Sequence, residues 1–161
     1  IKRIMAYTTI NKSTDYFNTT LYSGSGSTQS VNIGYDLTTD GGMVWLKPRN
    51  STDHHRLLDT VRGKDSTLSP NQTAAAGDNN NFNAFTSTGF ELLSGDSGWN
   101  NTGTNYVSWN WVAGSGNDTG TSNTDGSISS TVSANTTAGF SICQWTGSGA
   151  NATIGHGLGA V

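Results

Sequence analysis

Short runs of β-branched and aromatic residues alternate along the chain with clusters of Gly, Asn, Asp and Ser. The runs recur at intervals of about 8 to 15 residues, a spacing that is typical of antiparallel sandwiches and barrels. The pattern predicts strands near residues 16–22, 29–35, 42–48, 54–60, 82–86, 89–94, 104–113, 127–133, 138–146 and 150–155. The fold class that follows is all-β, an antiparallel β-sandwich.

The clearest strand signal is Tyr106-Val107-Ser108-Trp109-Asn110-Trp111-Val112-Ala113. Alternation divides these side chains between two faces, Val107, Trp109, Trp111 and Ala113 on one and Tyr106, Ser108 and Asn110 on the other. We expect the tryptophan face to point into the core because it is the more apolar one. The segment Met43-Val44-Trp45-Leu46 is apolar on both faces, as expected for a strand in the middle of a sandwich or under an interface.

The composition narrows the classes of partner. The chain has 161 residues, of which 12% are charged, with 8 basic against 11 acidic side chains and a net charge of −3. Such a chain lacks the basic surface of a nucleic-acid or anionic-membrane binder. No apolar run approaches the roughly 20 residues of a membrane helix, so membrane insertion is not expected. The single cysteine, Cys143, has no partner for an internal disulfide.

The domain organisation follows from one polar stretch and one repeat. Residues 114–126 are almost entirely Gly, Ser, Asn, Thr and Asp, which predicts a linker between a β-sandwich module at 5–113 and a segment at 127–161. Within the second segment, Phe140-x-x-x-x-Trp145-Thr146-Gly147-Ser148-Gly149 repeats the layout of Phe17-x-x-x-x-Tyr22-Ser23-Gly24-Ser25-Gly26. The repeat predicts that residues 127–161 are the opening β-hairpin of a second, truncated module. We expect this segment to pack on the first unit or to pair with a neighbouring chain by strand addition.

Several segments together resemble a module of tailed-bacteriophage virion proteins of the marine or cyanophage type, which are tail-fibre or structural proteins. They are Met5–Ser13, Leu21–Gly24, Val44–Arg49, His55–Gly63 and Tyr106–Trp111, with Gly139–Ile142 and Gly155–Gly159 resembling the opening of the next module. The resemblance implies a concanavalin-A-like jelly roll in a surface-exposed, extracellular virion appendage. It also implies other virion proteins or copies of the chain itself as partners, in a homo-oligomer, with host-surface polysaccharide as a further ligand.

The function expected from this resemblance and the composition is non-enzymatic attachment to a host-surface glycan. The alternative is a purely architectural virion protein, a capsid decoration or appendage subunit, and the less favoured one is a polysaccharide depolymerase. Glycoside hydrolysis needs two facing carboxyl groups. The single glutamate, Glu91, has no acidic residue two positions away on its strand, so we expect no catalytic residues.

Candidate ligand-binding residues follow from the chemistry of sugar recognition, in which pyranose faces stack on indoles while amides, carboxylates and guanidinium groups bind hydroxyls. Trp99 is the leading candidate because Ser97-Gly98-Trp99-Asn100-Asn101 is typical of a loop. The complete predicted set is Trp99, Asn100, Asn101, Trp45, Arg56 and Asp59.

No cofactor is expected, and metal ligands are scarce. The adjacent His54 and His55 would point to opposite faces of a strand and so do not make a zinc pair. Asp78 and Asn80 offer oxygen ligands suitable for calcium, but the spaced acids and closing glutamate of a defined calcium loop are missing. A solvated loop is the preferred interpretation of that run.

Overall fold

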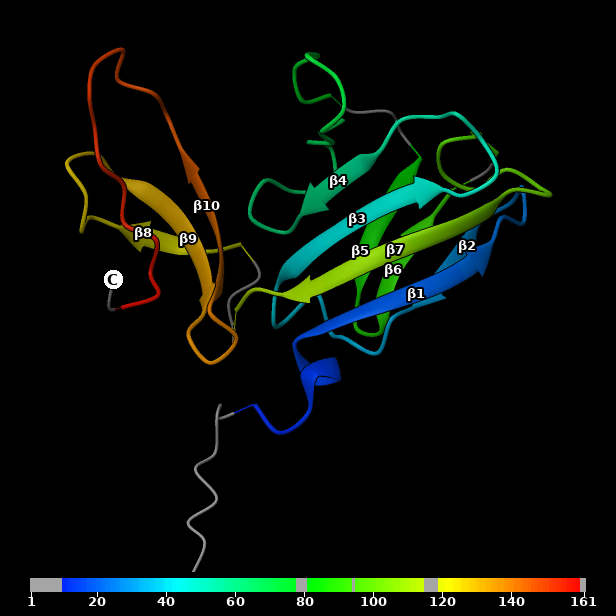
Figure 1. Ribbon diagram of the computed structural model, residues 1–161, viewed down its shortest axis with the longest axis horizontal. Helices are drawn as coiled ribbons and strands as arrows, with labels where there is room; N and C mark the ends of the chain where they lie inside the picture. The colour runs from blue at the N-terminus through cyan, green and yellow to red at the C-terminus, as the bar shows by residue number, and fades with distance from the viewer. Residues whose placement is uncertain (1–9, 78–80, 94, 115–118, 160–161) are drawn as a thin grey trace, which may run out of the picture.

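The chain is an antiparallel all-β protein in the computed structural model, which describes residues 10–77, 81–93, 95–114 and 119–159. Its strands form three sheets, and the only helical segment of the described residues is the short 3-10 turn η1 (Ser13–Asp15). Two sheets stack as a β-sandwich, with the four-stranded sheet in front in Figure 1 and the third sheet beside them. No helix in the described part is long and apolar enough to cross a bilayer.

The strand order of each sheet is simple. The front sheet has the order β1 (Phe17–Ser23), β7 (Asn105–Val112), β3 (Gly42–Pro48), β4 (Arg56–Asp59). The back sheet has the order β2 (Gln29–Asn32), β6 (Gly89–Leu92), β5 (Phe82–Thr86). The third sheet has the order β10 (Phe140–Trp145), β9 (Ser130–Asn135), β8 (Thr121–Asn123).

The hydrophobic core lies between the first two sheets. Its largest fully buried side chains come from both sheets and from the loops: Leu37, Val44, Leu46, Leu58, Phe90, Leu92, Trp99 and Tyr106. Burial of one large apolar side chain contributes about 1.5–3 kcal/mol, so these residues supply most of the driving force for stacking the sheets.

The prediction for the two faces of β7 was wrong. Tyr106, Ser108 and Asn110 point into the sandwich and are fully buried, whereas Trp109 and Trp111 lie on the outer face and are half-buried. The inner face is held by specific partners, because the ring of Tyr106 stacks on Tyr22 of β1 at 4.9 Å. Asn110 donates to the side chains of Asn18 at 2.8 Å and Ser108 at 3.1 Å. These contacts satisfy polar groups that burial would otherwise penalise.

Most predicted strands are present, one is displaced, one is absent, and one strand was not predicted. The strands predicted at 42–48 and 82–86 are confirmed with the same bounds. The strand expected at 127–133 lies at Ser130–Asn135, and residues 150–155 form no strand. Thr121–Asn123, inside the predicted linker, forms β8 and pairs with β9. A polar Thr-Ser-Asn strand carries no hydrophobic alternation, so the sequence pattern could not reveal it.

The third sheet contacts the sandwich through an aromatic pair. The ring of Phe140, at the start of β10, stacks on Trp111 of β7 with centroids 6.0 Å apart. The segment that follows β10 crosses back over β9, where the Ser130 hydroxyl donates to the carbonyl of Gly155 at 2.9 Å. The segment after β10 therefore covers part of the small sheet, and the pair of Phe140 and Trp111 joins this sheet to the sandwich.

Replacing Gly42 with alanine tests the close packing of β3 against β7. A Cβ at Gly42 would overlap with the carbonyl oxygen of Trp111 and lie 2.7 Å from Leu37 Cδ2. We expect Gly42→Ala to lower the free energy of unfolding by about 1–3 kcal/mol, as overpacking does. Gly77→Ala is the control, since a Cβ there meets nothing within 4 Å. Urea unfolding should show that control within about 0.5 kcal/mol of the parent chain. Equal stabilities of the two variants would contradict this register.

Candidate functional site

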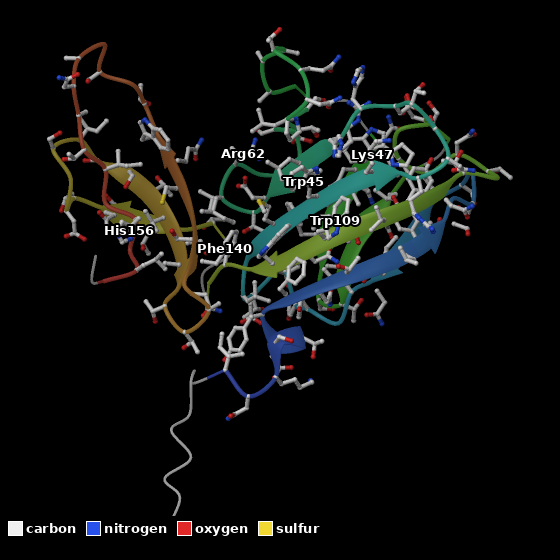
Figure 2. The ribbon with its side chains drawn as sticks, viewed as in Figure 1. Trp45, Lys47, Arg62, Trp109, Phe140 and His156 are labelled. Atoms are coloured by element: carbon white, nitrogen blue, oxygen red, sulfur yellow. The ribbon has the colours of Figure 1, made fainter. Side chains whose placement is uncertain are left out.

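Three tryptophans lie on the outer face of the front sheet. The register of β3 and β7 puts Trp45 directly opposite Trp109 and Met43 opposite Trp111. On the other side of β7, Trp109 is opposite Thr19 and Trp111 is opposite Phe17 of β1. Paired residues of an antiparallel sheet project to the same side, so these side chains form one continuous surface. Figure 2 shows Trp45 and Trp109 side by side on β3 and β7.

We call this surface the outer tryptophan face and define it as Trp45, Trp109, Trp111, Phe17 and Leu21. The rings of Trp45 and Trp109 meet edge to face, with centroids 5.9 Å apart and planes inclined by 66°. Trp111 contacts Phe17 at 4.8 Å. Phe17 and Leu21 are 38% and 61% exposed, and with the tryptophans they form one apolar patch of the kind that marks an interaction surface.

A cavity of about 340 Å³ lies at one end of this face. It lies between the start of β1, the end of β7 and the turn that joins β9 to β10, and its lining includes Tyr16, Phe17, Trp111 and Phe140. The outer tryptophan face therefore continues into a concave aromatic site, where a ligand would lose more of its contact with water than on the flat sheet.

His55 fixes the orientation of Trp45. The indole N–H of Trp45 donates to Nδ1 of His55 at 2.9 Å, and the two rings meet edge to face at 5.6 Å. Burial, and then the positive charge of Lys47, lower the pKa of His55 below its ordinary value of 6.5. The Lys47 ammonium donates to the carbonyls of Pro48 at 2.6 Å and Ser51 at 3.0 Å. The neutral imidazole thus accepts the indole proton and holds the ring in place.

The leading sequence candidate, Trp99, is a core residue. Its side chain is only 1% exposed, and its ring contacts Phe82 at 6.2 Å. The Arg56 guanidinium carbon lies 5.6 Å from the centre of the Trp99 ring, so the predicted pairing of a guanidinium with an indole exists. The prediction that Trp99 contacts a ligand was nevertheless wrong, because no sugar can stack on an indole that the core covers.

Asn100 is also buried and has a structural part. Its side-chain amide donates to the carbonyls of Ser27 at 2.6 Å and Leu93 at 2.9 Å, and its Oδ1 accepts from the backbone N–H of Ser25 at 2.9 Å. These bonds tie the loop after β6 to the turn between β1 and β2. Asn101 is exposed, and its backbone N–H donates to the Tyr106 hydroxyl at 2.9 Å. The structure therefore assigns Asn100 a structural role, which is to hold these two loops together, in place of the predicted ligand contact.

The remaining predicted residues lie on different faces. Asp59 is 4% exposed and forms an ion pair with Arg62 at 2.6 Å, with its other oxygen accepting from the Arg62 backbone N–H at 2.8 Å. Arg56 points toward the core side of β4 and donates to the Ser69 hydroxyl at 3.0 Å. Of the six predicted residues, only Trp45 presents an aromatic surface on the outer tryptophan face. The set is not one site.

Two carboxylates that could serve chemistry are engaged within the protein. Glu91 accepts hydrogen bonds from Asn83 and from the Ser30 hydroxyl. Hydrogen bonds from Ser51 and Ser97 lower the pKa of Asp53. No group of three potential metal-ligating side chains occurs in the described ranges. The two calcium ligands considered from the sequence, Asp78 and Asn80, both lie outside those ranges.

Sequence reasoning missed Trp109 as a surface residue and His55 as the partner of Trp45. The alternation along β7 was recognised, but polarity was used to decide which face is buried. The sequence of β3 indicated such a surface, because both of its faces are apolar. Whichever face packs into the core, apolar side chains of the other face must lie on the outside. Trp45 and its neighbours on β7 are on that outer side.

Burial and the nearby Lys47 lower the pKa of His55, and this predicts that the stability of the fold depends on pH. Because the pKa of His55 is lowered in the folded state, the unfolded chain takes up this proton first as the pH falls. The contribution of neutral His55 to the free energy of unfolding is therefore fully present above pH about 6.5. It is lost as the pH falls from there through the pKa of His55 in the folded state. We expect His55→Gln to reduce the difference between urea unfolding at pH about 7.5 and about 5, and His54→Gln to preserve it. An unchanged difference in His55→Gln would contradict the assignment.

Comparison with known proteins adds a family. Residues 12–161 match the family described as a domain of unknown function, DUF7483. No curated protein and no solved structure matches the chain. Because the match covers nearly the whole sequence, the chain belongs to the DUF7483 family.

Proposed function

We propose that this chain is a non-enzymatic glycan-attachment module of a phage virion surface appendage, folded as a concanavalin-A-like jelly roll. In this proposal the contact surface is the outer tryptophan face. The observation that carries it is the placement of the half-buried Trp45 and Trp109 side by side on the outer side of the front sheet. The phage setting rests on the sequence resemblance described above.

The chemistry of this surface suits a carbohydrate. Indole faces stack on the apolar faces of sugar rings, while hydroxyl and amide groups around them bind sugar hydroxyls. Polar side chains share the outer face with the tryptophans: Thr19 and Ser23 on β1 and Asn105 on β7. His55 adds a ring nitrogen next to Trp45. Aromatic side chains together with a few polar groups are the usual composition of a small-ligand site.

The inclination of the two indoles restricts the type of glycan. Their planes differ by 66°, so Trp45 and Trp109 do not form one flat surface. A flat crystalline polysaccharide would require coplanar rings. A single soluble chain, in which successive sugar units turn relative to each other, fits two inclined rings better.

A binding function is also favoured over hydrolysis by the state of the carboxylates. Asp59 forms an ion pair with Arg62, and Glu91 is on a strand of the other sheet. Cleavage of a glycosidic bond would require two carboxyl groups on either side of the bond, at about 5–10 Å. Among the described strands of the front sheet, Asp59 is the only acidic residue. Attachment without cleavage is therefore the better interpretation.

Alanine replacement of the central tryptophans tests the proposal. The probe is a printed array of defined glucans, mannans, galactans and bacterial O-chains, followed by calorimetry with the best binder. We expect Trp109→Ala and Trp45→Ala each to cost about 2 kcal/mol, roughly thirtyfold in Kd. Trp145→Ala is the control, because that indole is 54% exposed on a different sheet. A folded parent chain that binds no glycan, or equal losses in all three variants, would overturn the proposal.

The architectural alternative is favoured by one observation, the exposure of Leu21 and Phe17 beside the tryptophans. Large apolar side chains exposed next to the tryptophans suit a protein partner better than a sugar. If the face joins copies of the chain, Leu21→Asp should shift the sedimentation coefficient toward the monomer. If the face binds glycan, the same variant should leave the sedimentation unchanged and alter the glycan Kd by less than about threefold, because Leu21 lies at the margin.

A further inference from the structure

The sequence repeat has a counterpart in the structure. β1 (Phe17–Ser23) leads into the turn Gly24-Ser25-Gly26, and β10 (Phe140–Trp145) leads into Gly147-Ser148-Gly149. Tyr22 and Trp145 occupy the same place in the two copies, two positions before the first turn glycine. The two segments can therefore be compared residue by residue.

The two turns have the same local geometry. In the first, the Ser25 hydroxyl donates to the Ser27 carbonyl at 2.7 Å and accepts from the Ser27 N–H at 3.2 Å. In the second, the Ser148 hydroxyl donates to the Ala150 carbonyl at 3.1 Å and accepts from the Ala150 N–H at 3.3 Å. Gly26 and Gly149 both have positive φ, 71° and 73°. The turn is thus formed by its own residues in both copies, whatever lies next to it.

The first copy is engaged by β7 and the loop that precedes it. β1 pairs along its whole length with β7. The N–H of Gly24 donates to the Thr104 carbonyl and that of Gly26 to the Asn100 carbonyl, both at 2.9 Å. Tyr22 stacks on Tyr106 and donates its hydroxyl proton to the Trp99 carbonyl at 2.8 Å. The strand, the turn and the aromatic residue all contact one segment, residues 99–112.

The second copy presents the same features without that cover. Within the described residues, β10 has a strand neighbour on one side only, β9. A Cβ at Gly147 or Gly149 would meet nothing within 4 Å, whereas at Gly24 it would overlap with the carbonyl oxygen of Asn101. Trp145 is 54% exposed, in contrast to Tyr22, which is largely covered. An open strand edge next to an exposed tryptophan is a site for strand addition.

We propose that the free edge of β10 and the turn after it bind a β7-type segment, meaning an extended segment with the pattern of residues 99–112 of this chain. It would come from another module of the same kind in which no β1 strand occupies that edge of the segment, pair antiparallel with β10 and cover Trp145. The chain's own β7 is not the donor, because it already lies between β1 and β3. This inference is independent of the glycan proposal, since it concerns a different sheet.

A strand that adds to the edge of β10 would be held by the same kinds of contact as other strands that add to a sheet edge. Main-chain hydrogen bonds supply affinity, and side-chain pockets on alternate positions supply specificity. In the first copy the specific contribution comes from the tyrosine pair and from the loop carbonyls that accept from the turn glycines. A donor that lacks the Trp-Asn-Asn loop or the aromatic strand would match the edge but not the turn and Trp145.

A peptide with the sequence of residues 99–112, extended by two lysines for solubility, is the probe for the test. Amide hydrogen exchange of the full chain is followed by mass spectrometry with and without the peptide. We expect exchange in residues 140–150 to slow at least tenfold at saturation, with no effect of a scrambled peptide. Unchanged exchange in this segment would overturn the proposal. So would a change confined to β1 and β3, because it would mean that the peptide replaces the chain's own β7.

Gly147→Ala sharpens the test. The added methyl group meets nothing within 4 Å in the chain itself, so we expect unchanged urea unfolding. In a complex that repeats the first copy, this methyl would occupy the place of the donor's loop carbonyl, as a Cβ at Gly24 would with Asn101. We expect peptide binding at least tenfold weaker than in the parent chain. Gly77→Ala is the matched control and should bind like the parent, and equal binding by Gly147→Ala would contradict the proposed pairing.

Discussion

The burial of Trp99 between the two sheets is the constraint on which the other arrangements depend. Its ring fills the core against Phe82, its carbonyl accepts from the Tyr22 hydroxyl, and the Arg56 guanidinium lies over its ring. The adjacent Asn100 ties the same loop to the turn after β1. With this loop fixed, β7 enters the sheet between β1 and β3 with Tyr106 facing inward. Alternation then places Trp109 and Trp111 outside. One loop tryptophan thus determines the side on which the other indoles lie.

The sequence predicts strands better than it predicts the faces they bury. Periodicity located β3 and β5 to the residue and identified the all-β class, because hydrophobic alternation and turn residues act locally. The buried face of β7 is a non-local property. It depends on Tyr22 stacking on Tyr106 and on Asn18 pairing with Asn110, contacts that link residues far apart in the sequence. Polarity alone gave the opposite answer, since the side-chain amide nitrogen of buried Asn110 finds hydrogen-bond acceptors on Asn18 and Ser108 in the fold.

The candidate site was predictable only in its residue types. A tryptophan near an arginine was expected and exists, but the pair is part of the core. Arg56 and Asp59 are three residues apart on one strand and therefore project to opposite faces of the sheet. They cannot both belong to a single site. Trp45 alone of the predicted set lies on the outer face with its ring presented. Its supporting partner, His55, could not be recognised without the position of β4 relative to β3.

The arrangement of β7 is unfavourable if stability alone is considered. Asn110 is fully buried with its Oδ1 lacking a hydrogen-bond partner among the described residues, while two tryptophans on the same strand remain half-exposed. Burying an unsatisfied polar atom costs about 1–3 kcal/mol, and leaving indoles outside forgoes burial energy. Departures from the pattern of apolar inside and polar outside are concentrated at functional surfaces. The half-buried indoles on the outer face of β7 and β3 are such a departure. Contact with a ligand or partner would bury the rest of their surface and add the stabilisation that the core does not provide.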